Sequence, residues 1–247
     1  MSNRFFVEGR HESGQAVPLS GSDAHKIISV LRMRQGDTIE IIDSAAQRFR
    51  ATLAIDERSV RAELGERIGS PASVLPHVTV AQGVPKGQKM DFVVEKLTEL
   101  GAAEIIPLQS ERTIVNGVSE NKIERWRRLA KTAAQQCGRD DIPRIADPLA
   151  LADLCKTFAA YDVVLFPWEL ADRVPLRDLL PELVADARRI LVLVGPEGGF
   201  SHAEAAAAHS AGAQLISLGS RILRTETAAL AVLAVLNYLT ETQRARV

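Results

Sequence analysis

The chain is poor in cysteine, and its two cysteines suit neither a metal site nor a disulfide framework. Only Cys137 and Cys155 occur among the 247 residues. Neither belongs to a CxxC pair, and neither lies at zinc spacing from a histidine. We therefore expect no disulfide framework and no metal, and we interpret both thiols as buried and inert.

Long apolar runs are also lacking. The longest run, residues 228–236, is far shorter than the ~20 residues that a membrane-spanning helix needs. The first ten residues have no apolar segment of the kind found in secretory signals. These features predict a cytoplasmic protein without a membrane partner.

Net charge is almost absent. The sequence holds 30 lysines and arginines against 31 acidic residues, with a formal charge of -1. Because indiscriminate nucleic-acid binding needs clustered cations, any RNA-binding surface has to be local. Residues 121–144 are one candidate, with seven basic side chains against three acidic ones.

The hydrophobic pattern divides the chain into two parts. Residues 3–67 contain short strands separated by turns, which predicts a small β barrel. A short helix is expected within residues 20–34, with Ile27, Val30 and Leu31 on one face. Residues 68–76, rich in Gly, Ser and Pro, predict the boundary between a domain of residues 1–70 and a domain of residues 71–247.

Strands and helices alternate after this boundary, which predicts an α/β domain with a sheet covered on both faces. A helix over residues 120–137 should end at Gly138, a suitable residue after a helix end. The last helix, residues 225–239, is apolar on nearly every face. It is therefore expected to be buried, either in the core or in a dimer interface.

Two glycine-containing turns lie close together near the carboxyl end, each after a predicted strand. Residues 195–199 read GPEGG, and Ser201 with Glu204 has the spacing of a capping box. Residues 218–225 read LGSRILRT and precede the last helix. Glycine lets a backbone approach a ligand closely, and α/β sheets bind ligands at the carboxyl ends of strands. The turns therefore predict one pocket built mostly from backbone groups.

The first turn fits neither a GxGxxG fingerprint nor a Walker loop. Together, however, GPEGGFSxxE and LGxRILRxETA resemble the SPOUT class of RNA methyltransferases and, within it, the family that methylates N3 of a uridine in 16S ribosomal RNA. Residues 25–37, HKIISVLRMRQGD, resemble the element that opens that family's PUA-like domain. Residues 133–143 resemble its helix-ending element, with Gln135 where the family often has glutamate.

This resemblance implies an N-terminal PUA-like β barrel that binds RNA, followed by an α/β SPOUT domain with a trefoil knot. It also implies a homodimer that uses S-adenosyl-L-methionine, needs no metal and acts on 16S rRNA or the small ribosomal subunit. The residues expected to bind the cofactor are Leu193, Gly195, Glu197, Gly198, Gly199, Leu218, Gly219, Ile222, Leu223 and Arg224. Those expected to bind RNA are Arg4, Arg10, His25, Arg32, Arg34, Lys86, Arg139 and Arg221.

Methyl transfer to uracil N3 requires loss of the N3 proton and stabilisation of negative charge on the neighbouring carbonyl oxygens. A buried arginine such as Arg224, or Arg139 or Lys86, could supply the cation. Glu197 or Glu169 could accept the proton, although Glu197 could instead hold its turn. We take Arg224 and Glu197 as the catalytic residues.

Two other functions remain compatible with the sequence. One is a SPOUT methyltransferase that acts on a ribose 2′-OH or on guanine N1. The other is a noncatalytic RNA-binding factor for ribosome assembly that keeps the fold. Binding of S-adenosylmethionine would separate the enzymes from the assembly factor.

Overall fold

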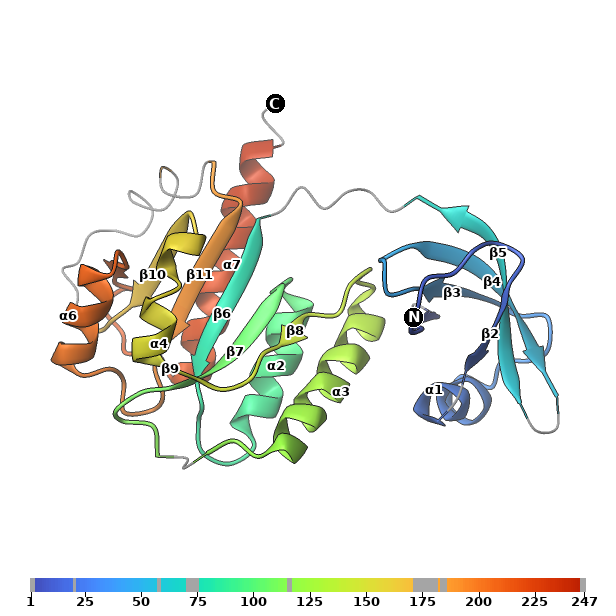
Figure 1. Ribbon diagram of the computed structural model, residues 1–247, viewed down its shortest axis with the longest axis horizontal. Coiled ribbons are helices and arrows are strands. Elements are labelled where there is room, and N and C mark those ends of the chain that lie inside the picture. Colours follow the sequence, from blue (N-terminus) through green and yellow to red (C-terminus); the bar gives the residue numbers. More distant parts are fainter. Residues whose placement is uncertain are drawn as a thin grey trace. The chain divides into compact units, whose positions relative to one another are not determined.

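The chain forms two compact units in the computed structural model, which describes residues 3–19, 21–56, 59–69, 76–114, 117–170, 182 and 186–244 (Figure 1). The first unit comprises Met1–Ser73 and Ala134–Ile142, and the second comprises Val74–Ala133 and Pro143–Val247. The division between Ser73 and Val74 falls within the expected boundary, of which residues 70–75 lie outside the described residues. The sequence did not indicate that Ala134–Ile142 would join the first unit.

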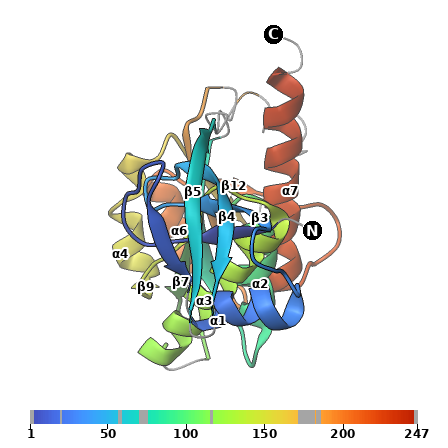
Figure 2. The same cartoon turned by 90° about the vertical axis from the view of Figure 1, so that its right-hand side faces the viewer.

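The first unit is built on a five-stranded sheet with the order β1-β3-β4-β5-β2. Its strands are β1 (Arg4–Phe6), β2 (Ala16–Leu19), β3 (Thr38–Ile42), β4 (Arg48–Ile55) and β5 (Val60–Ile68). Figure 2 shows β4 beside β5, its antiparallel neighbour. Buried residues alternate with exposed ones along most of β4 and the first half of β5, as the period of a half-buried strand requires. The strand pairings of the described residues do not test whether this sheet closes into a barrel, so the barrel stays a prediction.

The helical segment of the first unit differs from the single short helix that the sequence predicts. It consists of α1 (Gly21–His25) and a π-helix, η1 (Lys26–Val30). The wider turn, closed by a hydrogen bond of 2.8 Å from Leu31 N–H to the Lys26 carbonyl, changes which residues face inward. Ile27 is fully buried as expected, whereas Val30 is 65% exposed, so its expected inner position is wrong.

The second unit contains a parallel sheet with the order β12-β10-β11-β6-β7-β8, and β9 pairs with β7. Its strands are β6 (His77–Gly83), β7 (Glu104–Gln109), β8 (Arg144–Ile145), β9 (Leu149–Ala150), β10 (Val163–Pro167), β11 (Arg189–Val194) and β12 (Gln214–Ile216). Parallel pairing throughout brings the carboxyl ends of all these strands to one edge. The predicted α/β class is confirmed.

Helices cover both faces of this sheet. One face packs against α2 (Lys89–Glu99), α3 (Glu120–Cys137) and α7 (Thr225–Arg244), and the other packs against α4 (Leu151–Cys155), η2 (Phe158–Ala160) and α6 (His202–Ser210). Figure 1 shows α7 and α4 on opposite sides of the sheet. In β11, Val192 points to the first layer and Leu191 and Leu193 point to the second. Burial on both faces explains the continuous apolar run of this strand.

The last helix, α7, is buried on one face only. Val232, Leu233 and Leu236 belong to the core, but Val235 is 37% exposed and Tyr238 is 68% exposed. One face of α7 therefore lies in the core as expected, and burial of the other face in a dimer interface stays a prediction. Within the described part of the chain, no helix is both long enough and apolar enough to cross a membrane.

Candidate cofactor site

Three loops at the carboxyl ends of β10, β11 and β12 surround two adjoining cavities in the second unit. The first has a volume of about 380 Å³ and is lined mainly by the turn after β11 and the start of α7. The second has a volume of about 290 Å³ and is lined mainly by the loops after β10 and β12. The cavities share Pro167, Glu169, Ile222, Leu223 and Ala228. They lie where an α/β sheet is expected to bind its ligand.

Nearly all residues that the sequence assigns to cofactor binding line these cavities. The first cavity contains Gly195, Glu197, Gly198, Gly199, Ile222, Leu223 and Arg224. The second contains Leu218 and Gly219, together with Ile222 and Leu223. Leu193 is the exception, because its side chain is fully buried in the core and lines neither cavity. Any contact of Leu193 with a ligand has to come from its backbone.

The turn after β11 requires glycine because its backbone folds back on itself. A Cβ on Gly195 would lie 3.2 Å from the Gly199 carbonyl carbon. Gly199 has a φ of 64°, and its N–H donates to the Pro196 carbonyl at 2.9 Å. Glycine adopts this left-handed conformation without the steric cost of a side chain. Side chains at these positions would meet neighbouring atoms of the turn, so glycine is what allows its tight path.

The helix after this turn, α6, begins with the predicted capping box. The Ser201 hydroxyl accepts from Glu204 N–H at 3.2 Å, and the Glu204 carboxylate accepts from Ser201 N–H at 2.9 Å. The second carboxylate oxygen of Glu204 accepts from Glu111 N–H at 2.7 Å. The capping box is confirmed, and it also fixes the loop after β7 beside the glycine turn.

Glu197 is held firmly as a carboxylate. It accepts a hydrogen bond from Lys86 N–H at 3.0 Å, and the Lys89 ammonium lies 3.2 Å away. Burial raises the pKa of Glu197, but the hydrogen bonds from backbone N–H groups and from Lys89 bring it below its ordinary value. A carboxylate with a lowered pKa is a weak base. The geometry favours the alternative reading, in which Glu197 holds its turn.

Glu169 differs from Glu197 in its position and in the surroundings of its carboxylate. It lies directly after Trp168, which follows β10, and it lines both cavities. Across the residues that the structure describes, no hydrogen bond or ion pair to its carboxylate is found. Its oxygen Oε1 faces the Gly199 backbone. Glu169 can therefore accept a proton from a ligand without first breaking an ion pair.

Two cations line the first cavity. Arg224 comes directly before α7 and is exposed, so the expectation of a buried arginine is wrong. The Lys89 ammonium, which the sequence did not single out, lies between Glu197 and Glu226, at 3.9 Å from the latter. Lys89 belongs to the first turn of α2, so only the packing of α2 beside α7 brings it to the site.

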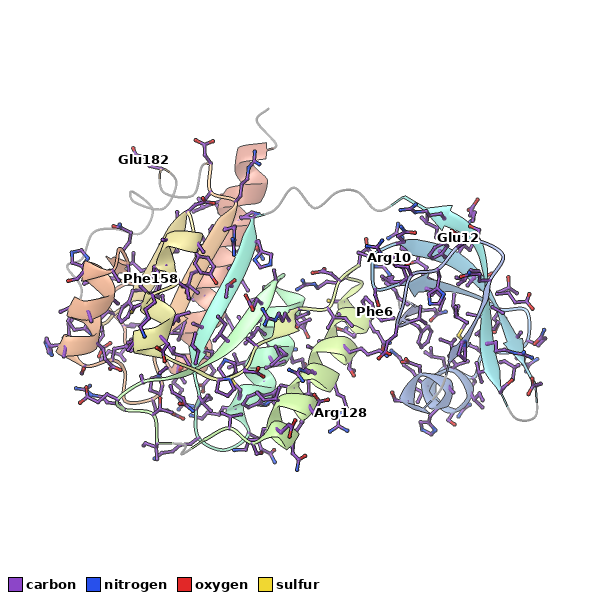
Figure 3. All side chains as sticks on the ribbon, in the orientation of Figure 1. Phe6, Arg10, Glu12, Arg128, Phe158 and Glu182 are labelled. Carbon is purple, nitrogen blue, oxygen red and sulfur yellow. The ribbon has the colours of Figure 1, made fainter. Side chains whose placement is uncertain are left out.

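The residues expected to bind RNA form two groups, one with exposed side chains and one with side chains held in ion pairs. Arg10, His25, Arg32 and Arg34 of the first unit and Lys86 and Arg221 of the second are exposed. Figure 3 labels Arg10, which follows β1. Arg4 is different: its side chain is 11% exposed and binds Glu40 at 2.8 Å and Asp140 at 2.9 Å. The Arg139 side chain is 13% exposed and pairs with Asp141 at 2.6 Å. Arg4 and Arg139 therefore have little surface left for a phosphate.

Neither metal nor cysteine chemistry is apparent at the site. The described residues contain no group of three His, Cys, Asp or Glu side chains that could hold a metal ion. Burial raises the pKa of the Cys155 thiol, consistent with an inert group. Cys137 is exposed at the end of α3 and Cys155 is only half-buried, so the expectation that both thiols are buried is wrong.

Comparison with known proteins identifies the class to which this fold and site belong. A family model described as an RNA methyltransferase domain matches residues 73–237. A ribosomal RNA small subunit methyltransferase E from Bacillus subtilis is 30% identical over 98% of both chains. One from Synechocystis is 32% identical over 98% of this chain and 79% of its own.

Solved structures agree with this assignment. A Legionella pneumophila protein in complex with its cofactor S-adenosylmethionine has a TM-score of 0.87 and 30% identity, and covers 96% of this chain and 98% of its own. The ribosomal RNA small subunit methyltransferase E of Neisseria gonorrhoeae, bound to S-adenosylmethionine, has a TM-score of 0.82 and 28% identity. The match covers 97% of this chain and 98% of that protein. The chain belongs to the ribosomal RNA small subunit methyltransferase E family, which confirms the predicted SPOUT class.

Proposed function

We propose that this chain transfers the methyl group of S-adenosylmethionine to N3 of a specific uridine in the 16S rRNA of the small ribosomal subunit. The observation that carries the proposal is the pair of cavities at the strand ends, which places Glu169 and Arg224 beside a turn of three glycines. Family membership supplies the substrate class, because the named relatives are small subunit rRNA methyltransferases.

The residues at the site suit a cofactor of this size and charge. The first cavity, at about 380 Å³, lies within the ~300–1,000 Å³ common for small-molecule sites. The turn at residues 195–199 would hold the cofactor through its backbone, and Leu218, Ile222 and Leu223 would enclose the apolar part. When bound, S-adenosylmethionine supplies a methyl group on a positively charged sulfur. The carboxylates of Glu169 and Glu197 provide the matching negative charge.

Glu169 is the group that we assign to proton removal. The N3 atom of uracil forms its bond to the methyl carbon as the bond from sulfur to that carbon breaks, and the electron pair of the broken bond stays on sulfur. The N3 proton has to leave, and the Glu169 carboxylate lines both cavities and can accept it. Glu169 thus takes the role of proton acceptor that the sequence predicts for Glu197. We assign Glu197 to holding the turn.

Arg224 is the group that we assign to charge stabilisation. As N3 loses its proton, negative charge spreads over the neighbouring carbonyl oxygens of uracil. Arg224 lines the first cavity, and its backbone is anchored because its carbonyl accepts from Ala228 N–H at 2.8 Å. A cation that contacts these oxygens as the charge develops stabilises the transition state more than the ground state.

The first unit would bind RNA as a PUA-like barrel. Its exposed cations Arg10, His25, Arg32 and Arg34, with Lys86 and Arg221 of the second unit, are the candidates for contact with phosphate or bases. Because N3 lies on the Watson–Crick edge, the target uridine has to be unpaired or flipped out. A reaction on small subunit rRNA would take place in the cytoplasm.

We also propose the knot and the homodimer that the family resemblance implies. After β12, at the sheet edge, the chain returns to pack α7 against β6 and β11 in the middle of the sheet, a path compatible with threading through a loop. The exposed Val235 and Tyr238 on α7 offer an apolar face for a second copy. Light scattering of the parent and of Tyr238→Glu tests the dimer, which the added charge should dissociate.

Calorimetry and a transfer assay test the proposed function. The protein should bind S-adenosylmethionine, which a noncatalytic assembly factor has no need to do. With a radiolabelled methyl donor it should label 16S rRNA and leave 23S rRNA unlabelled. Absence of cofactor binding would favour the assembly factor, whereas label on a ribose 2′-OH or on guanine N1 would favour another SPOUT activity.

A further inference from the structure

A buried polar pair connects strand β6, the glycine turn and helix α7. Gln82 of β6 is fully buried, and its Nε2 donates to the Thr225 hydroxyl at 2.7 Å and to the Gly83 carbonyl at 3.0 Å. The Thr225 hydroxyl in turn donates to the Gly195 carbonyl. The direction is fixed, because the two backbone carbonyls can only accept. Gln82, Thr225 and Gly195 thus form one relay of hydrogen bonds.

The turn lies directly on the strand at this point. A Cβ on Gly83 would stand 2.4 Å from Pro196 N and 2.6 Å from the Gly195 carbonyl carbon, so no side chain fits there. The peptide that joins Gly195 to Pro196 is therefore in contact with β6 on one side, while Thr225 holds its carbonyl. Arg112 holds the far end of the turn through the Gly198 carbonyl at 2.9 Å.

Stability alone does not explain a glutamine at this position. Its second polar atom, Oε1, is buried, and no hydrogen-bond partner is found for it in the described parts of the chain. A buried acceptor without a partner costs stability, and an apolar side chain of similar size would avoid that cost. The two neighbours of Gln82 that precede it, Val80 and Ala81, are both apolar and fully buried. The advantage of Gln82 lies in the geometry that it imposes.

We propose that Gln82 and Thr225 are positioning residues, which set the orientation of the Gly195 peptide and the start of α7 so that the methyl donor is held correctly beside Arg224. Thr225 suits this role because it lines the first cavity, is 6% exposed and directly follows Arg224. The inference rests on the proposed function of the cavity as the S-adenosylmethionine site. It adds two residues to that site which touch no reacting atom.

Three variants test the relay. Thr225→Val keeps the shape of threonine but has no hydroxyl, and Thr225→Ser keeps the hydroxyl. Gln82→Met keeps the length of glutamine but cannot donate to Thr225. We expect Thr225→Val and Gln82→Met to bind S-adenosylmethionine at least tenfold more weakly and to lower kcat at least tenfold with saturating cofactor. Thr225→Ser should stay within threefold of the parent in both measurements.

Thermal unfolding distinguishes positioning from a general loss of structure. Gln82→Met removes the acceptor without a partner but also two hydrogen bonds of the amide, so the opposing effects should leave its Tm close to that of the parent even though its affinity falls. A lower Tm for Gln82→Met with proportionate loss of affinity would overturn the proposal, as would parental affinity in Thr225→Val. Equal loss in Thr225→Val and Thr225→Ser would show that shape matters and the hydroxyl does not, which also overturns it. A parent that binds no cofactor would overturn the proposed function and the relay with it.

Discussion

Gly199 and Glu169 face each other in the first cavity: a Cβ on Gly199 would lie 3.1 Å from Oε1 of the Glu169 carboxylate. The absence of a side chain at Gly199 therefore keeps the carboxylate beside the turn. It follows that the glycine serves two purposes, the left-handed backbone of the turn and the position of the proton acceptor.

Gly199→Ala should weaken binding of S-adenosylmethionine at least tenfold. The methyl group would meet Glu169 inside the cavity, and the left-handed backbone, with a φ of 64°, would add a stability cost of about 1–2 kcal/mol. Gly212→Ala is the matched control, because Gly212 also has a positive φ, 109°, but no atom lies within 4 Å of its would-be Cβ. Calorimetry should show parental affinity in Gly212→Ala despite its lower Tm. Equal affinity in both variants would separate Gly199 from the ligand.

Glu169→Gln should lower kcat about a hundredfold or more, because a positioned general base typically contributes ~10²–10⁴-fold. Glu197→Gln should mainly weaken cofactor binding, since it loses the ion pair of 3.2 Å with Lys89 that holds the turn. Single-turnover rates at saturating cofactor and RNA separate the two effects. If Glu197→Gln shows the larger loss of rate, the assignment of the base reverts to Glu197.

Arg224→Ala should lower kcat about a hundredfold, a loss of ~2.7 kcal/mol in transition-state stabilisation, with little change in cofactor affinity. Arg221→Ala is the control within the same loop, because its exposed side chain lines only the second cavity. We expect Arg221→Ala to raise KM for RNA and leave kcat unchanged, as loss of a phosphate contact does. Parental single-turnover chemistry in Arg224→Ala would remove that residue from the mechanism.

Asp43 should make the stability of the first unit dependent on pH. Burial raises its pKa, but N–H groups of His11, Ala45 and Gln47 donate to its carboxylate at 2.8–3.0 Å and lower the pKa below the ordinary 3.8. A carboxyl whose pKa is lower in the folded than in the unfolded protein stabilises the fold at pH values above its unfolded-state pKa. This contribution is lost as the pH falls through the pKa of the folded state.

Asp43→Asn should therefore lower the free energy of unfolding by about 1–3 kcal/mol at pH 7, because buried donors lose a charged acceptor. The difference from the parent should shrink below pH 3.8. Urea unfolding at pH 7 and at acid pH measures both values. Asp147→Asn, at a side chain that is 90% exposed, should change neither. A difference that grows at acid pH would contradict the assignment.

The glycine turns, the capping box and the α/β class could be predicted because each depends on neighbours in sequence. Lys89 and Gln82 could not, since their partners Glu197 and Thr225 lie 108 and 143 positions away. Nothing near Lys89 in the sequence indicates a carboxylate. Only the order of the parallel strands, which places β11 beside β6, brings these residues together.

Gln135 shows the same limit in the first unit. The family resemblance leads to an expectation of glutamate there, but the Gln135 amide donates to Asp23 at 3.0 Å and accepts from Lys26 at 3.3 Å. Glutamate would bring a second carboxylate against Asp23. The partner lies 112 positions away, so the sequence alone gives no reason for the departure.

The most direct test of the proposed function is mass spectrometry of nucleosides from 16S rRNA. Small subunits from a strain without this gene would be incubated with the purified protein and S-adenosylmethionine carrying a deuterated methyl group. We expect deuterated N3-methyluridine at a single position, and none with Glu169→Gln over the same short incubation. Label on a ribose, on another base or on no nucleoside would contradict it.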